Sequence, residues 1–95
     1  MKKYVIVRTY SAGCFWGQLA ARDGREVTLE NATRIWYWAG ASSLSELAVL
    51  GTSRPSACKF PVAVPRIVLL EAIEIIDMTE EAVKSLKAVK TWTQH

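Results

Sequence analysis

Runs of β-branched and aromatic residues alternate with turn residues along the first part of the chain. Residues 3–10 are apolar or β-branched on both alternating faces until Arg8, which predicts a strand at the centre of a sheet, covered on both sides. Residues 11–13 end this run, and a second strand is predicted over Cys14–Ala21. Gly17 interrupts that strand and indicates a bulge or a close backbone contact.

A two-residue hairpin is the clearest local signal. Asp23-Gly24 precedes a third strand over residues 25–29, and this dipeptide suits a type I′ turn, in which both central residues need positive φ. Residues 30–32 suit a further turn, after which residues 33–38 predict a fourth strand because they are rich in aromatic side chains. With a period of two, one face of that strand would carry Arg34, Trp36 and Trp38.

Two short helices are expected in the second half of the chain. Ser43 and Glu46 fit a capping box, in which the serine hydroxyl accepts from a backbone N–H and the glutamate reaches back. That helix would end at Gly51. Its inward side chains would be Leu44, Leu47, Ala48 and Leu50. The last helix is predicted to begin near Asp77 or Thr79.

Residues 52–66 contain all the prolines and predict a loop or an extended edge, which at this length is uncommon unless it binds something. Residues 67–70 and 72–76 are β-branched enough to form one long bent strand or two. The order of these elements predicts a single α+β domain over residues 1–95. It would have a mainly antiparallel sheet of about five to six strands and two short helices.

Composition agrees with a folded domain. With 95 residues the chain can bury one core, and its 51% apolar and 22% charged residues are typical of globular proteins. No apolar run approaches the ~20 residues that cross a bilayer, so no membrane partner is expected. The apolar run that follows Met1-Lys2-Lys3 is too short for a signal peptide. We therefore expect a cytoplasmic protein, in which Cys14 and Cys58 are free thiols.

The residues that enzymes and metal sites need are scarce, and we expect no catalysis, no cofactor and no bound metal. The one histidine, His95, is the last residue, which leaves a Ser-His-Asp or Cys-His mechanism without a credible base. Cys14 and Cys58 lack His or Cys neighbours at zinc-ligand spacing. The common glycine-rich phosphate loops are absent from the sequence.

Basic and aromatic residues are the candidates for binding. The net charge is +3, but residues 1–66 hold nine Lys or Arg and four Asp or Glu (+5), whereas residues 67–95 hold three and five (−2). Aromatic rings stack on nucleobases, and Arg pairs with phosphate. The candidate ligand-binding residues are Arg8, Tyr10, Arg34, Trp36, Trp38, Arg54 and Lys59. Each tryptophan could instead be a core or oligomer contact.

Four segments resemble a family of small bacteriophage and prophage proteins, most of them known only as a domain of unknown function: residues 4–13, 34–41, 58–61 and 71–76. The same pattern is similar to phage anti-defence sponges, which counter the Thoeris system by sequestering a cyclic ADP-ribose signal. This resemblance implies a homo-oligomer, in an infected bacterial host, that binds its nucleotide between protomers without turning it over.

Two other functions stay open. A protein-interaction module that inhibits or recruits a host factor would use the same exposed aromatic and Arg side chains. Nucleic-acid binding is less favoured, since the acidic residues 67–95 and the small total charge give a weak electrostatic footprint. Self-association is expected in any case, because the apolar strands and four tryptophans exceed what so small a core covers.

Overall fold

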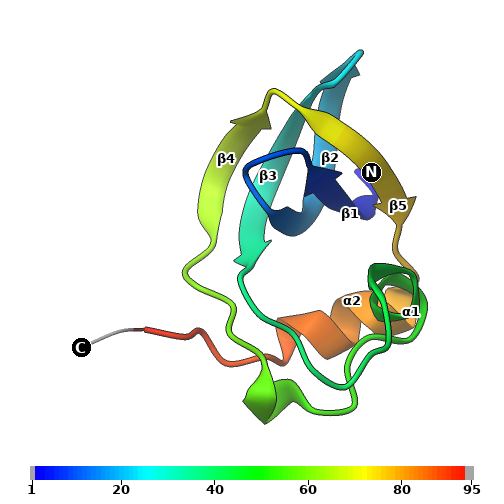
Figure 1. Cartoon of the computed structure of the whole chain (residues 1–95), viewed down its shortest axis with the longest axis vertical. Coiled ribbons are helices and arrows are strands. Elements are labelled where there is room, and N and C mark those ends of the chain that lie inside the picture. Colours follow the sequence, from blue (N-terminus) through cyan, green and yellow to red (C-terminus); the bar gives the residue numbers. More distant parts are fainter. Residues whose placement is uncertain (1, 94–95) are drawn as a thin grey trace.

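Five antiparallel strands form one curled sheet, and two α-helices pack against it (Figure 1). The computed structural model describes residues 2–93. Its elements are β1 (Tyr4–Thr9), β2 (Cys14–Asp23), β3 (Glu26–Ile35), α1 (Leu44–Leu50), a 3₁₀ turn (Pro55–Ala57), β4 (Val64–Leu69), β5 (Ala72–Asp77) and α2 (Glu80–Lys87). The predicted α+β arrangement, with an antiparallel sheet and two short helices, is confirmed.

Strands β4 and β5 are consecutive in the chain but lie at opposite edges of the sheet, whose order is β4-β3-β2-β1-β5. Leu70 and Glu71 carry the chain from one edge to the other, and Figure 1 shows the pair of strands as an arch over the sheet. The bend is held at Glu71, whose carbonyl accepts from the backbone N–H of Tyr10 at 3.0 Å. Residues 67–76 therefore form two strands rather than one.

Two hydrophobic clusters lie on opposite faces of the sheet. The cluster inside the curl draws on all five strands and contains Val5, Val7, Phe15, Val27, Leu29, Ala32, Leu69 and Ala72. The cluster between the sheet and the helices contains Ile6, Trp16, Ile35, Leu47, Ala48, Cys58, Phe60 and Leu86. Because side chains alternate along a strand, β1 contributes to both clusters. The predicted cover on both sides is confirmed, but β1 is the strand next to the β5 edge, and the centre of the sheet is β2.

Side chains cap both helices at their N-termini. The hydroxyl of Ser43 accepts from the backbone N–H of Glu46 at 3.2 Å, as predicted. The carboxylate of Glu46 accepts from the N–H of Ser42 at 2.7 Å, one residue earlier than a capping box requires. At α2 the hydroxyl of Thr79 accepts from the N–H of Ala82 at 3.0 Å, so the predicted start near Thr79 is also confirmed.

The buried face of α1 is narrower than predicted. Leu47 and Ala48 are buried, but Leu50 is 57% exposed, so its predicted inward position is wrong. The close contact with α2 is made by the next residue, Gly51, which packs against Ser85. The helix ends at Gly51 as predicted.

The predicted hairpin exists, but its turn lies one residue further along. Asp23 pairs with Glu26, which leaves Gly24 and Arg25 as the turn. Gly24 has a φ of +60° and Arg25 does not have a positive φ. This is the pattern of a type II′ turn, with glycine at the first central position, rather than type I′.

Strand β3 runs unbroken through residues 30–32, so the turn predicted there is wrong. Asn31 and Ala32 together oppose Gly17 of β2, which makes a β-bulge, and Asn31 takes a φ of +50° within it. A Cβ on Gly17 would lie 3.0 Å from the Cα of Ala32, so the close backbone contact predicted at Gly17 is confirmed. Asn31, a residue type that is common in turns, therefore forms part of a β-bulge here.

Two further boundaries are the end of β3 and the start of β4. The strand predicted over residues 33–38 ends at Ile35, because Ile35 already pairs with the first residue of β2. Residues 52–66, predicted as a loop or an extended edge, form both, because the loop ends where the edge strand β4 begins at Val64, and this strand includes Pro65. Proline is tolerated there because β4 is an edge strand with one unpaired side.

Candidate functional site

Two tryptophans and a lysine meet at the surface near the end of the described chain. The rings of Trp36 and Trp92 are stacked, with centroids 5.2 Å apart and an interplanar angle of 18°. The Nζ of Lys59 lies 5.4 Å from the ring centroid of Trp36 and 5.6 Å from that of Trp92. We call Trp36, Lys59 and Trp92 the tryptophan cluster.

Backbone pairing brings these three distant segments together. Tyr37 and Lys59 form an antiparallel bridge, with N–H to carbonyl distances of 3.2 and 2.8 Å. Phe60 forms a parallel bridge with Thr91, and the N–H of Trp92 donates to the carbonyl of Phe60 at 2.9 Å. Lys59 is itself bridged, and Trp36 and Trp92 are each next to a bridged residue, so the backbone fixes where the two rings and the lysine stem begin.

The cluster combines an open aromatic surface with a positive charge. Trp36 is 59% exposed, so part of its ring is available for stacking. The ammonium of Lys59 lies within the ~6 Å at which it is attracted to an aromatic ring. This contact restricts the positions that the ammonium group takes. A flat ligand with an anionic group fits both features.

The strand face predicted for Arg34, Trp36 and Trp38 does not exist, because β3 ends before the two tryptophans. Arg34 lies over the ring of Phe15, 4.6 Å from its centroid. Trp38 is partly buried against the helices, and its indole N–H donates to the carbonyl of Ala41 at 3.2 Å. Of these three residues, the structure places only Trp36 in the cluster.

The other candidates lie in different places. Arg8 is paired with Glu74 of β5, with an Nε to Oε1 distance of 3.1 Å. Tyr10 is 78% exposed at the turn that follows β1. Arg54 precedes the 3₁₀ turn, and its backbone N–H donates to the hydroxyl of Thr52 at 3.0 Å. Lys59 is therefore the one candidate that joins Trp36.

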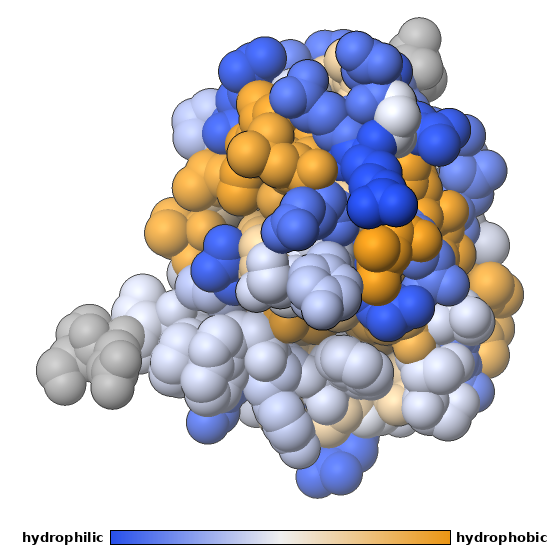
Figure 2. Space-filling model, turned by 45° about the horizontal axis from the view of Figure 1, so that its top comes forward, coloured by the Kyte–Doolittle hydropathy of each residue, from blue (hydrophilic) through white to orange (hydrophobic). Residues whose placement is uncertain are grey.

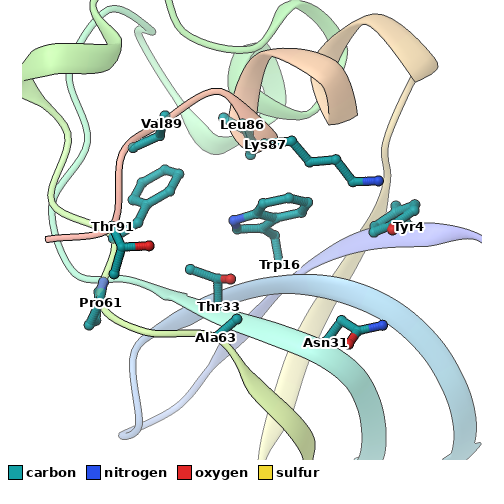
Figure 3. A pocket seen from close by; sticks show the side chains of 11 residues that line it. Tyr4, Trp16, Asn31, Thr33, Pro61, Ala63, Leu86, Lys87, Val89 and Thr91 are labelled. Atoms are coloured by element: carbon teal, nitrogen blue, oxygen red, sulfur yellow. The ribbon is translucent and has the colours of Figure 1, made fainter.

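A pocket of about 230 Å³ lies between the sheet and the helical layer, around Trp16 (Figure 3). Trp16 is 6% exposed, and its indole N–H has no hydrogen-bond partner within residues 2–93. Tyr4 packs against it with ring centroids 5.9 Å apart. The pocket is partly open to the surface, since Lys87 and Thr91 in its lining are exposed, and the unpaired donor belongs to its buried wall.

Groups suited to nucleophilic or metal chemistry are few in the described chain. Both cysteines are free. Burial raises the pKa of the Cys14 thiol above its usual range, outweighing the opposite effect of nearby Arg8, so the thiol is protonated and weakly nucleophilic at neutral pH. Residues 2–93 contain no group of three or more His, Cys, Asp or Glu side chains that could hold a metal. His95 lies outside the described residues.

None of the helices formed by residues 2–93 is long and apolar enough to cross a membrane. Comparison with protein families matches residues 2–86 to a domain of unknown function, DUF6948. The chain belongs to this family. No curated protein and no solved structure matches the chain. The description of this family assigns it no activity.

The sequence analysis missed Trp92 and did not place Trp16 among the candidate ligand-binding residues. Trp92 follows α2 in a short tail without a periodic pattern, and only the high count of four tryptophans hinted at it. Trp16 lies in an apolar stretch of β2. The sequence pattern of such a stretch is the same whether the side chain belongs to the core or lines a pocket. Only the packing distinguishes the two.

Proposed function

We propose that this protein binds a small nucleotide signal of the cyclic ADP-ribose type at the tryptophan cluster and sequesters it without catalysis. The stacked, exposed ring of Trp36 beside the charge of Lys59 carries the proposal. The resemblance of residues 34–41 to phage anti-defence sponges supports the choice of nucleotide. We propose the cytoplasm of an infected bacterial host as the setting.

The base and the phosphate of such a ligand match the aromatic surface and the positive charge of the cluster. A nucleobase can stack on the open part of Trp36, a contact of about 1–3 kcal/mol. A phosphate can then approach Lys59, whose ammonium is held beside the same rings. No step of this proposal breaks or forms a covalent bond.

Calorimetric titration of the protein with cyclic ADP-ribose tests the proposal. Trp36→Ala should weaken binding about 5- to 150-fold, the equivalent of one lost stacking contact, and Lys59→Gln should weaken it and reduce its salt dependence. Two variants serve as controls because they change an exposed ring and an exposed charge outside the cluster: Tyr10→Ala and Lys84→Gln. Both should bind as the wild type does.

Mass spectrometry of the ligand released by heating completes the test. A sponge returns the intact nucleotide, whereas an enzyme returns a product. Hydrolysed ligand, or unchanged affinity in a folded Trp36→Ala protein, would overturn the proposal.

A second candidate function is protein binding, favoured by the exposed apolar residues near the bend between β4 and β5. Tyr10 is 78% exposed, Leu70 is 68% exposed and Ile73 is 47% exposed. Figure 2 shows hydrophobic side chains in patches on this face of the molecule, interrupted by hydrophilic ones. We call Tyr10, Leu70 and Ile73 the bend patch, and propose a second copy of this chain as its partner. Capture of a stoichiometric host protein instead would favour an interaction module.

A further inference from the structure

We propose that the pocket around Trp16 is a second binding site, which takes a small, flat heterocycle carrying a carbonyl or ring-nitrogen acceptor. Three features carry this inference: an unpaired buried donor, the chemistry of the surrounding walls and the size of the cavity. None of the side chains of the tryptophan cluster lines this pocket, so the site is separate from the one proposed above.

The unpaired donor is the indole N–H of Trp16. Its side chain belongs to a residue that is 94% buried, yet the nitrogen has no partner among the described residues. Buried polar groups are nearly always hydrogen-bonded, so an exception requires an explanation. An indole nitrogen can only donate, and therefore the missing partner must be an acceptor. Figure 3 shows the nitrogen on the side of the ring that faces Thr91 and Thr33.

The walls select an apolar molecule with acceptors. Leu86 and Val89 contribute aliphatic surface, and the hydroxyl groups of Thr33 and Thr91 can donate to a second acceptor. None of the described lining residues is acidic. The one charged lining residue is Lys87, whose Nζ lies 4.9 Å from the ring centroid of Tyr4. A cationic ligand therefore has no partner here.

The volume restricts the ligand to a single small ring system. The cavity of about 230 Å³ is below the roughly 300–1,000 Å³ of pockets for drug-sized molecules. It equals the liquid volume of about eight water molecules at ~30 Å³ each. A six-membered lactam or a pyrimidine is of this size, whereas a whole nucleotide is too large.

NMR spectroscopy of the ¹⁵N-labelled protein reports directly on the proposed contact, because each indole N–H gives its own signal. The Trp16 signal is identified by its absence in Trp16→Phe or, if that variant does not fold, by its proximity to the methyl groups of Leu86. Titration with 2-pyridone, which carries a carbonyl acceptor, should shift this signal saturably. Benzene, of similar size without an acceptor, should bind about tenfold more weakly, since it leaves the N–H unpaired.

The variant Trp36→Ala serves as the matched control, because it disrupts the tryptophan cluster and leaves the pocket lining intact. It should bind 2-pyridone as the wild type does, so the failure of one site is distinguishable from the failure of the other. Three results would overturn the inference: no saturable shift of the Trp16 signal, equal affinity for benzene, or shifts confined to Trp36 and Trp92. A Trp16 N–H satisfied only by trapped water gives the first of these.

Discussion

Gly51 shows how a single residue fixes the contact between the two helices. Its φ of +78° and ψ of −154° lie in a region that is essentially restricted to glycine. A Cβ at this position would also collide with the Cβ and Oγ of Ser85 in α2. The N–H of Thr52, the next residue, donates to that same Oγ at 2.9 Å. Backbone conformation and close packing therefore both require glycine.

The variant Gly51→Ala should lose about 3 kcal/mol or more of unfolding free energy, since strain and overpacking each cost about 1–3 kcal/mol. Gly24→Ala is the matched control, because Gly24 also has a positive φ (+60°) but has nothing within 4 Å of the added Cβ. It should lose about 1–2 kcal/mol. Urea denaturation of both variants measures the difference. Equal losses of unfolding free energy would show that close packing against Ser85 adds nothing to the cost of the Gly51→Ala substitution.

At the scale of the elements, Thr79 joins the two helices as well as capping one of them. Its hydroxyl accepts from the N–H of Ala82 at 3.0 Å and donates to the carbonyl of Val49, in α1, at 2.6 Å. Its backbone N–H donates to the carbonyl of Ala48 at 3.0 Å. The hydroxyl of Thr79 thus caps the first turn of α2 and forms a hydrogen bond with α1.

Removing this hydroxyl should cost more than removing an isolated cap. Thr79→Ala should lower the unfolding free energy by about 1–2 kcal/mol, because it loses a cap and a second hydrogen bond. Thr79→Ser keeps the hydroxyl and should stay close to the wild type, while Ser43→Ala should lose about 1 kcal/mol. Thermal melts beside urea titrations provide the measurement. A Thr79→Ser protein as unstable as Thr79→Ala would point to the lost methyl group instead.

Strand boundaries depended on pairing partners more than on composition. Residues 33–38 are as rich in β-formers as any segment, yet β3 stops at Ile35 because its neighbour β2 begins opposite that residue. In the other direction, Pro65 lies inside β4 because an edge strand needs hydrogen bonds on only one side. Neither reason can be found within the segment itself.

At the scale of the whole molecule, both edges of the sheet and the bend patch are exposed. Such edges and apolar surfaces favour association. Light scattering of the eluted protein at micromolar concentration should therefore give a mass above that of one chain, and Leu70→Lys should lower it to that of the monomer. Val49→Lys is the control, since Val49 is 50% exposed on α1, away from the patch. A monomeric wild type would contradict self-association, and equal effects of both variants would place the interface elsewhere.

The sequence by itself determined the local elements of this protein. The hairpin at Gly24 and the caps at Ser43 and Thr79 each depend on neighbours within a few residues, so their signals are local. The α+β class followed from the order of these elements.

Only the tertiary structure decided which distant residues meet. Trp36, Lys59 and Trp92 come together through backbone bridges between segments more than 20 residues apart in the chain. No spacing rule connects such segments, because their contact is set by how the sheet curls and where the helices pack. For the same reason Arg8 and Arg34, equally plausible as ligand contacts in the sequence, lie beside Glu74 and Phe15. The unpaired N–H of Trp16 likewise depends on how side chains from the strands, the loop before β4 and α2 pack around it, since a buried tryptophan in a strand has the same pattern with or without a pocket.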